Sequence, residues 1–194
     1  MLGVVLCGGQ STRMGTDKGL LKLHANTWAQ TAIDKLSELQ LPIIISVNKS
    51  QLEEYCTIFL PEQLVTDNYS LDIRGPLSGV LSVHIQYPTE DLVLLACDMP
   101  LMETVLLKEL VKAYHEHPAN DAFVFTNDGE PEPLCGIYKA SGLALILQLY
   151  QNKQIPKFSM KYMLEQVSAF TIPVGDDKKK CFRNFNAHAE LNGL

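Results

Sequence analysis

Short apolar runs alternate along the chain with longer segments of mixed polarity. From these runs we predict strands at Leu2–Cys7, Pro42–Val47, Asp91–Cys97, Asp121–Thr126, Cys135–Lys139 and Ala169–Val174. Some of the runs, such as Leu92–Ala96, are apolar at every position. That pattern is typical of strands buried on both faces of a parallel sheet.

Apolar residues in the segments between these runs recur at helical spacing. In residues 103–117 the apolar positions share one stripe, and Lys108, Glu109 and Lys112 face the other way. We also predict helices from the stripe between Trp28 and Leu39 and at Gly75–Tyr87, Ser141–Gln151 and Phe158–Gln166. Alternating strands and helices predict right-handed crossovers and a three-layer α/β domain. Ligands bind such open sheets beyond the carboxyl ends of the strands, so residues just after strands are the candidates for a site.

Length and charge narrow the class of protein. The 194 residues fit one domain spanning 1–194. The formal net charge of −6 argues against nucleic-acid binding, because a phosphate backbone demands a basic face. No apolar run reaches the length of a membrane span, and the N-terminus reads as a strand and not as a secretion signal. We therefore expect a cytoplasmic protein without membrane association.

The five cysteines are widely spaced and form no C-x-x-C pair. Their odd number and their spacing argue against a disulfide framework and against a structural zinc site. We expect most of them to be buried small apolar side chains. Cys7 and Cys97 lie beside the two candidate site loops, so a reactive thiol at either position stays open.

A glycine-rich loop follows the first predicted strand. It reads L-C-G-G-Q-S-T-R-M-G-T-D-K over residues 6–18. Adjacent glycines let the backbone approach a ligand, and successive N–H groups in such a loop form an anion-binding concavity. Arg13 and Lys18 add positive charge, while Asp17 could orient either of them or cap the next segment. The loop matches neither the P-loop nor the dinucleotide-binding fingerprint, yet it predicts a polyphosphate site.

An aspartate follows the most apolar of the predicted strands. Asp98 comes directly after Leu92–Cys97 and precedes Met99 and Pro100. Mg²⁺ prefers oxygen ligands and is commonly held by one or two carboxylates together with substrate phosphates. Asp98 is therefore a candidate metal ligand, and the alternative is that it starts the turn before the helix at 103–117. Together with the glycine-rich loop, it predicts a triphosphate held with a metal ion.

The loop at residues 6–18 resembles the signature L-x-G-G-x-S-x-R-M-G-x-D-K of the molybdenum cofactor guanylyltransferase family. The resemblance covers most of the chain. It implies a three-layer, Rossmann-like nucleotidyltransferase domain with a mainly parallel mixed sheet. It also implies a Mg²⁺-dependent enzyme that transfers GMP from GTP to the terminal phosphate of molybdenum-bound molybdopterin and releases pyrophosphate. Proteins that deliver the cofactor are possible partners.

The same resemblance assigns roles to single residues. It implies that Leu6, Cys7, Gly8, Gly9, Asn48 and Asp67 bind the nucleotide, that Lys18 and Arg13 act on the triphosphate, and that Asp98 binds both nucleotide and magnesium. Asp72 competes with Asp67, because the family's aspartate stands at a variable offset before G-P-L-x-G, here at residues 75–79. Asn48 is also a common turn residue, so a purely local role stays open for it.

The candidate acceptor-binding residues lie in the C-terminal segment. Asn184 and Asn186 match a late F-x-N-x-N segment that approaches the pterin in the family, although Asn186 is also a plausible helix N-cap. The T-P-E that usually follows is replaced here by residues 187–190, A-H-A-E. The sequence therefore identifies the nucleotide more firmly than it identifies the acceptor.

Three functions compete with GMP transfer to molybdopterin. Cytidylyltransferases of the same cofactor usually read L-A-A-G and P-K where this chain has Gly8 and Asp17–Lys18, which favours guanine. Enzymes that act on sugar 1-phosphates often carry G-x-G-T-R, which is absent here. The third alternative is a nucleotide-binding partner or chaperone for the cofactor that has lost catalysis. A binding screen of GTP against CTP, UTP and ATP, followed by a pyrophosphate assay, separates the three.

Overall fold

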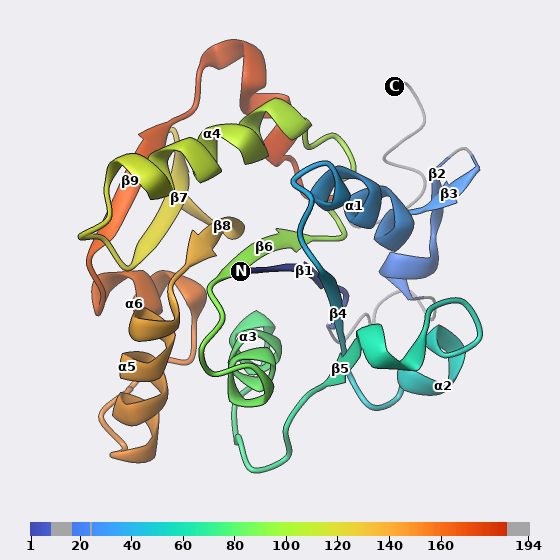
Figure 1. Ribbon diagram of the computed structural model, residues 1–194, viewed down its shortest axis with the longest axis horizontal. Coiled ribbons are helices and arrows are strands. Elements are labelled where there is room, and N and C mark those ends of the chain that lie inside the picture. Colours follow the sequence, from blue (N-terminus) through green and yellow to red (C-terminus); the bar gives the residue numbers. More distant parts are fainter. Residues whose placement is uncertain (9–16, 24, 186–194) are drawn as a thin grey trace.

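A mixed seven-stranded sheet forms the centre of the computed structural model, which describes residues 1–8, 17–23 and 25–185 (Figure 1). Its strand order is β5-β4-β1-β6-β8-β7-β9. The strands are β1 (Leu2–Leu6), β4 (Ile43–Val47), β5 (Leu64–Thr66), β6 (Leu92–Ala96), β7 (Ala122–Asn127), β8 (Glu130–Tyr138) and β9 (Ala169–Pro173). β8 runs antiparallel to β6 and β7, and the other neighbours pair in parallel.

Helices cover both faces of the sheet, so the predicted three-layer α/β architecture with a mainly parallel mixed sheet is confirmed. α1 and α4 lie on one face, and α3, α5 and α6 lie on the other (Figure 1). The helices are α1 (Trp28–Ser37), α2 (Leu52–Tyr55), α3 (Pro76–Gln86), α4 (Thr104–Glu116), α5 (Ala140–Gln151) and α6 (Met160–Glu165), with short 3₁₀ turns η1 (Lys18–Leu20), η2 (Pro61–Gln63) and η3 (Asp176–Phe182). A two-stranded ribbon joins β2 (Lys22–Leu23) to β3 (Asn26–Thr27).

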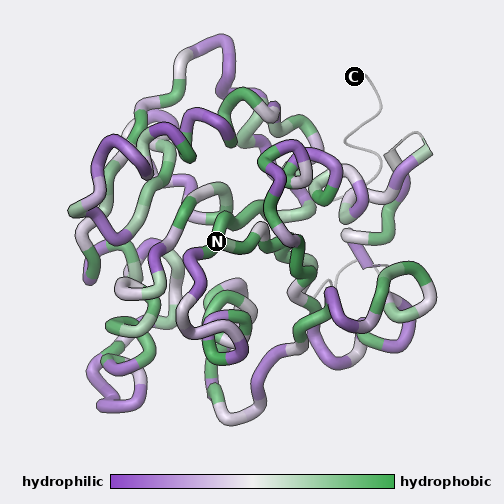
Figure 2. The backbone as a smooth tube through the Cα atoms, viewed as in Figure 1, coloured by the Kyte–Doolittle hydropathy of each residue, from purple (hydrophilic) through white to green (hydrophobic). Residues whose placement is uncertain are grey.

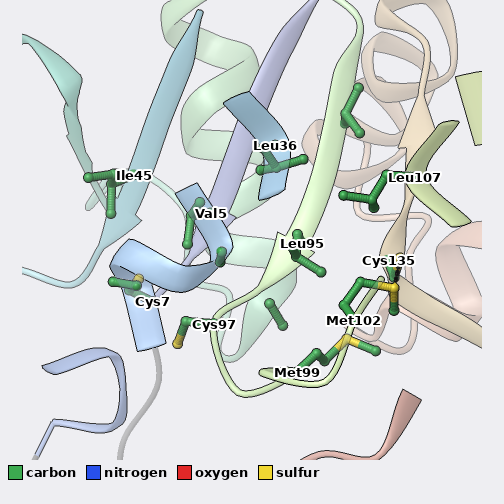
Figure 3. Close-up of a cluster of buried hydrophobic side chains, with 14 of the residues drawn as sticks. Val5, Cys7, Leu36, Ile45, Leu95, Cys97, Met99, Met102, Leu107 and Cys135 are labelled. Carbon is green, nitrogen blue, oxygen red and sulfur yellow. Dashed lines mark hydrogen bonds between the residues drawn. The ribbon is translucent and has the colours of Figure 1, made fainter. Parts of the chain in front are cut away.

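The central strands are buried on both faces, as their apolar runs predict. Every residue of β1 and of β6 is buried. Side chains of β1 alternate between the two layers, because successive residues of a strand point to opposite faces. Val5 packs with the α1 and α4 side (Figure 3), and Val4 and Leu6 pack with the α3 side. The tube in Figure 2 shows these strands as the hydrophobic centre of the molecule, with hydrophilic turns outside them.

Two strands of the seven-stranded sheet depart from the sequence prediction, and the short β2 and β3 were also not predicted. β5 is unpredicted because it has only three residues and sits at an edge of the sheet, where it carries little apolar signal. β8 begins at Glu130 and not at Cys135, although Pro131 and Pro133 are unfavourable in a strand. A register shift between Val124 and Phe125 places Pro133 in a bulge, whereas Pro131 stays paired with Thr126.

Four of the five cysteines are buried. Cys7, Cys97, Cys135 and Cys181 are buried, whereas Cys56 is exposed, and none of the five is in a disulfide. No helix within the described residues is both long enough and apolar enough to span a bilayer.

Candidate functional site

Four neighbouring parallel strands end at the same edge of the sheet, and the candidate nucleotide residues follow their ends. Cys7 and Gly8 follow β1, and Asn48 follows β4. Asp67 follows β5, and Asp98 stands two residues after β6. Residues that are far apart in the sequence therefore meet because parallel strands present their carboxyl ends at one edge.

A cavity of about 460 Å³ opens at this edge between the end of β1 and the start of α3. Four of the predicted nucleotide residues line it: Leu6, Gly8, Asn48 and Asp67. The lining also includes Gly75, Pro76 and Gly79 of the G-P-L-x-G motif, and the lining residues that the sequence analysis missed are Ser46, Lys49, Ser50, Tyr69, Ile73 and Arg74. Lys49, Ser50 and Tyr69 closely follow the ends of β4 and β5, which is the signal that could have identified them. The volume is that of a typical small-molecule site.

Asp67, and not Asp72, lies in this cavity. Burial raises the pKa of the Asp67 carboxyl, and a hydrogen bond with Ser78 lowers it in part. A β-carbon at Gly79 would come within 2.5 Å of the Ser46 hydroxyl oxygen, so the glycine lets α3 approach β4 closely. The backbone N–H of Asp72 instead donates to the Tyr150 hydroxyl.

The Cys7 side chain does not line the cavity but packs on the opposite face of the sheet, beside Cys97 (Figure 3). A hydrogen bond with Cys7, together with burial, raises the pKa of the Cys97 thiol well above its ordinary value. A thiol with a raised pKa is a poor nucleophile, because the thiolate is the reactive form. This environment argues against the reactive-thiol alternative for Cys97.

Gln51, which the sequence analysis missed, connects three parts of the site. Its side-chain amide donates to the Cys7 carbonyl oxygen over 3.0 Å and to a carboxylate oxygen of Asp17. Its carbonyl oxygen accepts from the Asn48 N–H over 2.8 Å. The N–H groups of Cys7 and Gly8 both donate to the Ser46 carbonyl oxygen. These bonds fix the ends of β1 and β4 relative to the start of η1.

Asp17 anchors the segment that carries Lys18. Its Oδ1 accepts the Gly19 N–H over 2.8 Å, which caps η1, and also accepts the Tyr55 hydroxyl over 3.1 Å. Tyr55 is fully buried, and burial raises the pKa of its hydroxyl, which therefore stays a donor. Of the roles left open for Asp17, the structure shows the cap.

Replacing Gly19 with alanine tests this anchor. A β-carbon there would overlap the Tyr55 hydroxyl, so we expect Gly19→Ala to lower the free energy of unfolding by about 1–3 kcal/mol, the usual cost of overpacking. Urea unfolding measures the loss. The double variant Gly19→Ala/Tyr55→Phe removes the overlapping oxygen and should recover part of it. Equal stability of Gly19→Ala and the parent protein would contradict the tight packing described.

Lys18 and Asp98 meet at the edge of the sheet. The ammonium nitrogen of Lys18 lies 3.5 Å from Asp98 Oδ2, and about a quarter of each side chain is exposed, 24% and 22%. Burial raises the pKa of the Asp98 carboxyl, and the Lys18 charge lowers it in part. The other oxygen, Oδ1, is buried without a hydrogen-bond partner among the described residues. A buried carboxylate oxygen without a donor is unfavourable unless a ligand completes it.

The C-terminal segment reaches the same loop. The Phe185 N–H donates to the Asp98 carbonyl oxygen over 2.9 Å, and the buried Phe185 ring packs against Trp28. Asn184 is exposed next to this contact. The predicted acceptor residue Asn184 therefore lies close to the Asp98 loop, while Gly9, Arg13 and Asn186 lie outside the described residues.

A family model and several relatives of known name match this chain over most of its length. The family model of the MobA-like NTP transferase domain matches residues 3–167. A protein of Geobacillus sp. named "Probable molybdenum cofactor guanylyltransferase" is 31% identical over 199 residues, covering 100% of this chain and 97% of its own. The molybdenum cofactor guanylyltransferase of Vibrio cholerae is 29% identical over 199 residues, covering 97% of this chain and 88% of its own.

The fold is also similar to solved structures. Molybdopterin-guanine dinucleotide biosynthesis protein A from Archaeoglobus fulgidus superimposes with a TM-score of 0.76 at 22% identity, covering 99% of this chain and 95% of its own. A nucleotidyl transferase from a Methanothermobacter species superimposes with a TM-score of 0.71 at 14% identity, covering 98% and 94%. At these identities the likeness concerns the fold.

Proposed function

The chain belongs to the MobA-like NTP transferase family, and on that premise we propose that it is a molybdenum cofactor guanylyltransferase. It transfers GMP from GTP to the terminal phosphate of molybdenum-bound molybdopterin, which forms the guanine dinucleotide cofactor and releases pyrophosphate. The observation that carries this proposal is the Lys18–Asp98 pair at the sheet edge where a cavity large enough for a nucleoside opens, although neither residue is part of the cavity lining. Relatives that match nearly the whole chain carry the same name.

The proposed reaction needs no covalent intermediate with the protein. An oxygen of the acceptor phosphate is already a nucleophile, and it forms a bond to the α-phosphorus while the bond to the pyrophosphate oxygen breaks. Catalysis then comes from in-line positioning and from stabilising the charge that develops on the leaving group. The Lys18 ammonium would supply that stabilisation, held in place by the Asp17 cap of η1. Arg13 would assist from the glycine-rich loop.

The residues at the sheet edge fit a magnesium ion. Asp98 Oδ2 pairs with Lys18, and Oδ1 is buried without a donor among the described residues, so Oδ1 is suited to a hard cation. No group of three or more His, Cys, Asp or Glu side chains suited to a metal occurs within the described ranges. One carboxylate matches the usual coordination of Mg²⁺, in which substrate phosphates provide further ligands. When bound, Mg²⁺ would neutralise charge on the triphosphate.

A pyrophosphate-release assay tests the proposed function. The purified protein is incubated with Mg²⁺, molybdenum-bound molybdopterin and GTP, CTP, UTP or ATP in turn. We expect pyrophosphate with GTP and at least tenfold less with each other nucleotide, because Gly8 admits a guanine edge close to the backbone. Faster release with CTP would contradict the guanine assignment. GTP binding without release would favour the non-catalytic cofactor chaperone, and a sugar 1-phosphate in place of the pterin tests the third alternative.

A further inference from the structure

An aromatic side chain stands exposed at the mouth of the candidate nucleotide cavity. Tyr69 is 71% exposed, which is unusual for a large aromatic residue whose burial would stabilise the fold. It lines the cavity of about 460 Å³ and also borders a second hollow of about 300 Å³. Burial in the hydrophobic core therefore does not account for its position.

The backbone beneath this ring is well fixed. The Asn68 N–H donates to the Ser82 hydroxyl over 2.8 Å, which ties the segment to α3. The side-chain oxygen of Asn68 accepts from the Ser70 N–H over 2.9 Å, and the Leu71 N–H donates to the Asn68 carbonyl oxygen over 3.0 Å. Leu71 is itself buried. Tyr69 is therefore the exposed residue of an ordered turn, and its position relative to Asp67 is set by that turn.

A cation from the neighbouring loop holds the ring. The Lys49 ammonium lies 5.1 Å from the centroid of the Tyr69 ring, within the range of a cation–π contact. Lys49 follows β4, and Tyr69 follows β5, so the contact links the two loops at the cavity. An ammonium covers one face of a ring and leaves the opposite face for another planar group.

We propose that Tyr69 is a base-stacking residue for the nucleotide and that Lys49 is its positioning residue. The inference rests on the proposed function, because it assumes that the cavity takes a nucleoside. A nucleobase that enters the cavity can contact Gly8, which follows β1, and the phenol ring of Tyr69, because both residues line it. Stacking of a base on an aromatic side chain is independent of the polar contacts deeper in the cavity and favours the larger purine surface.

Direct binding of nucleotides tests the inference without any transfer step. Isothermal titration with Mg²⁺ and no acceptor measures Kd for GTP, CTP and inorganic triphosphate. We expect Tyr69→Ala to weaken GTP binding about tenfold, which corresponds to about 1.4 kcal/mol, and CTP binding by less. Binding of inorganic triphosphate, which has no base, should stay unchanged. Tyr69→Phe keeps the ring and should bind GTP as the parent protein does.

The KM for GTP of Lys49 variants tests the positioning role of this residue. Lys49→Ala should raise the KM for GTP by about threefold and leave kcat unchanged, while Lys49→Arg, which keeps a cation over the ring, should restore the KM. In the Tyr69→Ala background, Lys49→Ala should have no further effect on KM.

The outcomes separate this inference from the proposed function. If the parent protein binds GTP and transfers GMP but Tyr69→Ala binds GTP equally well, the stacking role is wrong and the proposed function stands. If Tyr69→Ala weakens GTP and inorganic triphosphate by the same factor, the stacking role is also wrong, because the loss does not involve the base. If the parent protein binds no nucleotide, both proposals fall together.

Discussion

Asp98→Asn is expected to lower kcat for GMP transfer by about 10²-fold or more, without loss of stability. Asparagine has the same shape but no charge, so it is a much weaker ligand for Mg²⁺ and no longer pairs with the Lys18 ammonium. The oxygen that is buried without a partner among the described residues, Oδ1, is the atom that we propose as the Mg²⁺ ligand. The loss should therefore appear in kcat as well as in binding.

The thermal stability of Asp98→Asn distinguishes a role of Asp98 in the reaction from a role in the fold. Because burial raises the pKa of the Asp98 carboxyl above its value in the unfolded chain, ionisation of Asp98 opposes folding at pH values above that raised pKa. Asparagine removes the ionisation, so at neutral pH and without divalent metal the variant should unfold at the same temperature as the parent protein or higher. A scanning melting curve in EDTA measures this.

Asp72→Asn is the matched control for this variant. Asp72 is exposed and is absent from the lining of the cavity, so the same change there should leave kcat within about twofold. Activity of Asp98→Asn close to that of the parent protein would refute the metal assignment. A large drop in melting temperature would show that Asp98 supports the fold and not the reaction.

Lys18→Ala is expected to reduce kcat/KM for GTP by about 10²-fold, with both weaker binding and slower transfer. An ammonium beside phosphates stabilises the bound triphosphate and also the charge that grows on the departing pyrophosphate, so its loss affects both steps. Removing Lys18 also leaves the Asp98 carboxylate without its counter-charge, and the pKa of Asp98 should rise further. We expect the acid limb of the pH–rate profile to shift to higher pH in this variant.

The control for Lys18 is a lysine of the same segment. Lys22 is exposed on β2, four positions along the chain, and Lys22→Ala removes the same charge from the same region. That variant should keep GTP affinity and kcat within about twofold, because a solvated charge at a distance is screened. Unchanged affinity and rate in Lys18→Ala, or equal losses in the two variants, would exclude a specific contact of Lys18 with the triphosphate.

Much of the architecture was predictable because the strands that carry it are strongly apolar. Leu92–Ala96 reads as a strand buried on both faces, and both the strand and its burial are confirmed. The short edge strand β5 was missed, since three residues give almost no periodic signal. The proline-containing start of β8 was missed because Pro131 and Pro133 argue locally against a strand, and only pairing with β7 and the bulge make it one.

In the candidate site, too, some residues could be identified from local sequence patterns and others only from the structure. The glycine-rich loop, Lys18 and Asp98 were identified from local patterns, and their roles as a site remain predictions. Gln51 carries no local signal, since an isolated glutamine after a turn is ordinary, yet its amide joins Cys7, Asp17 and Asn48. That the Cys7 side chain points away from the cavity was also not predictable, because only the folded structure shows that the cavity lies on the face of Leu6.

The sequence by itself determined the three-layer α/β fold, the family and the residues that follow the strand ends, because buried strands, helix stripes and a glycine-rich loop are encoded by neighbouring residues. Only the tertiary structure decided that Lys18 pairs with Asp98, that Asp67 and not Asp72 lines the cavity, and that Tyr69 stands at its mouth beside Lys49. Those relations join segments that are distant along the chain. They depend on the order and parallel register of β5, β4, β1 and β6, which long-range packing establishes and local patterns do not.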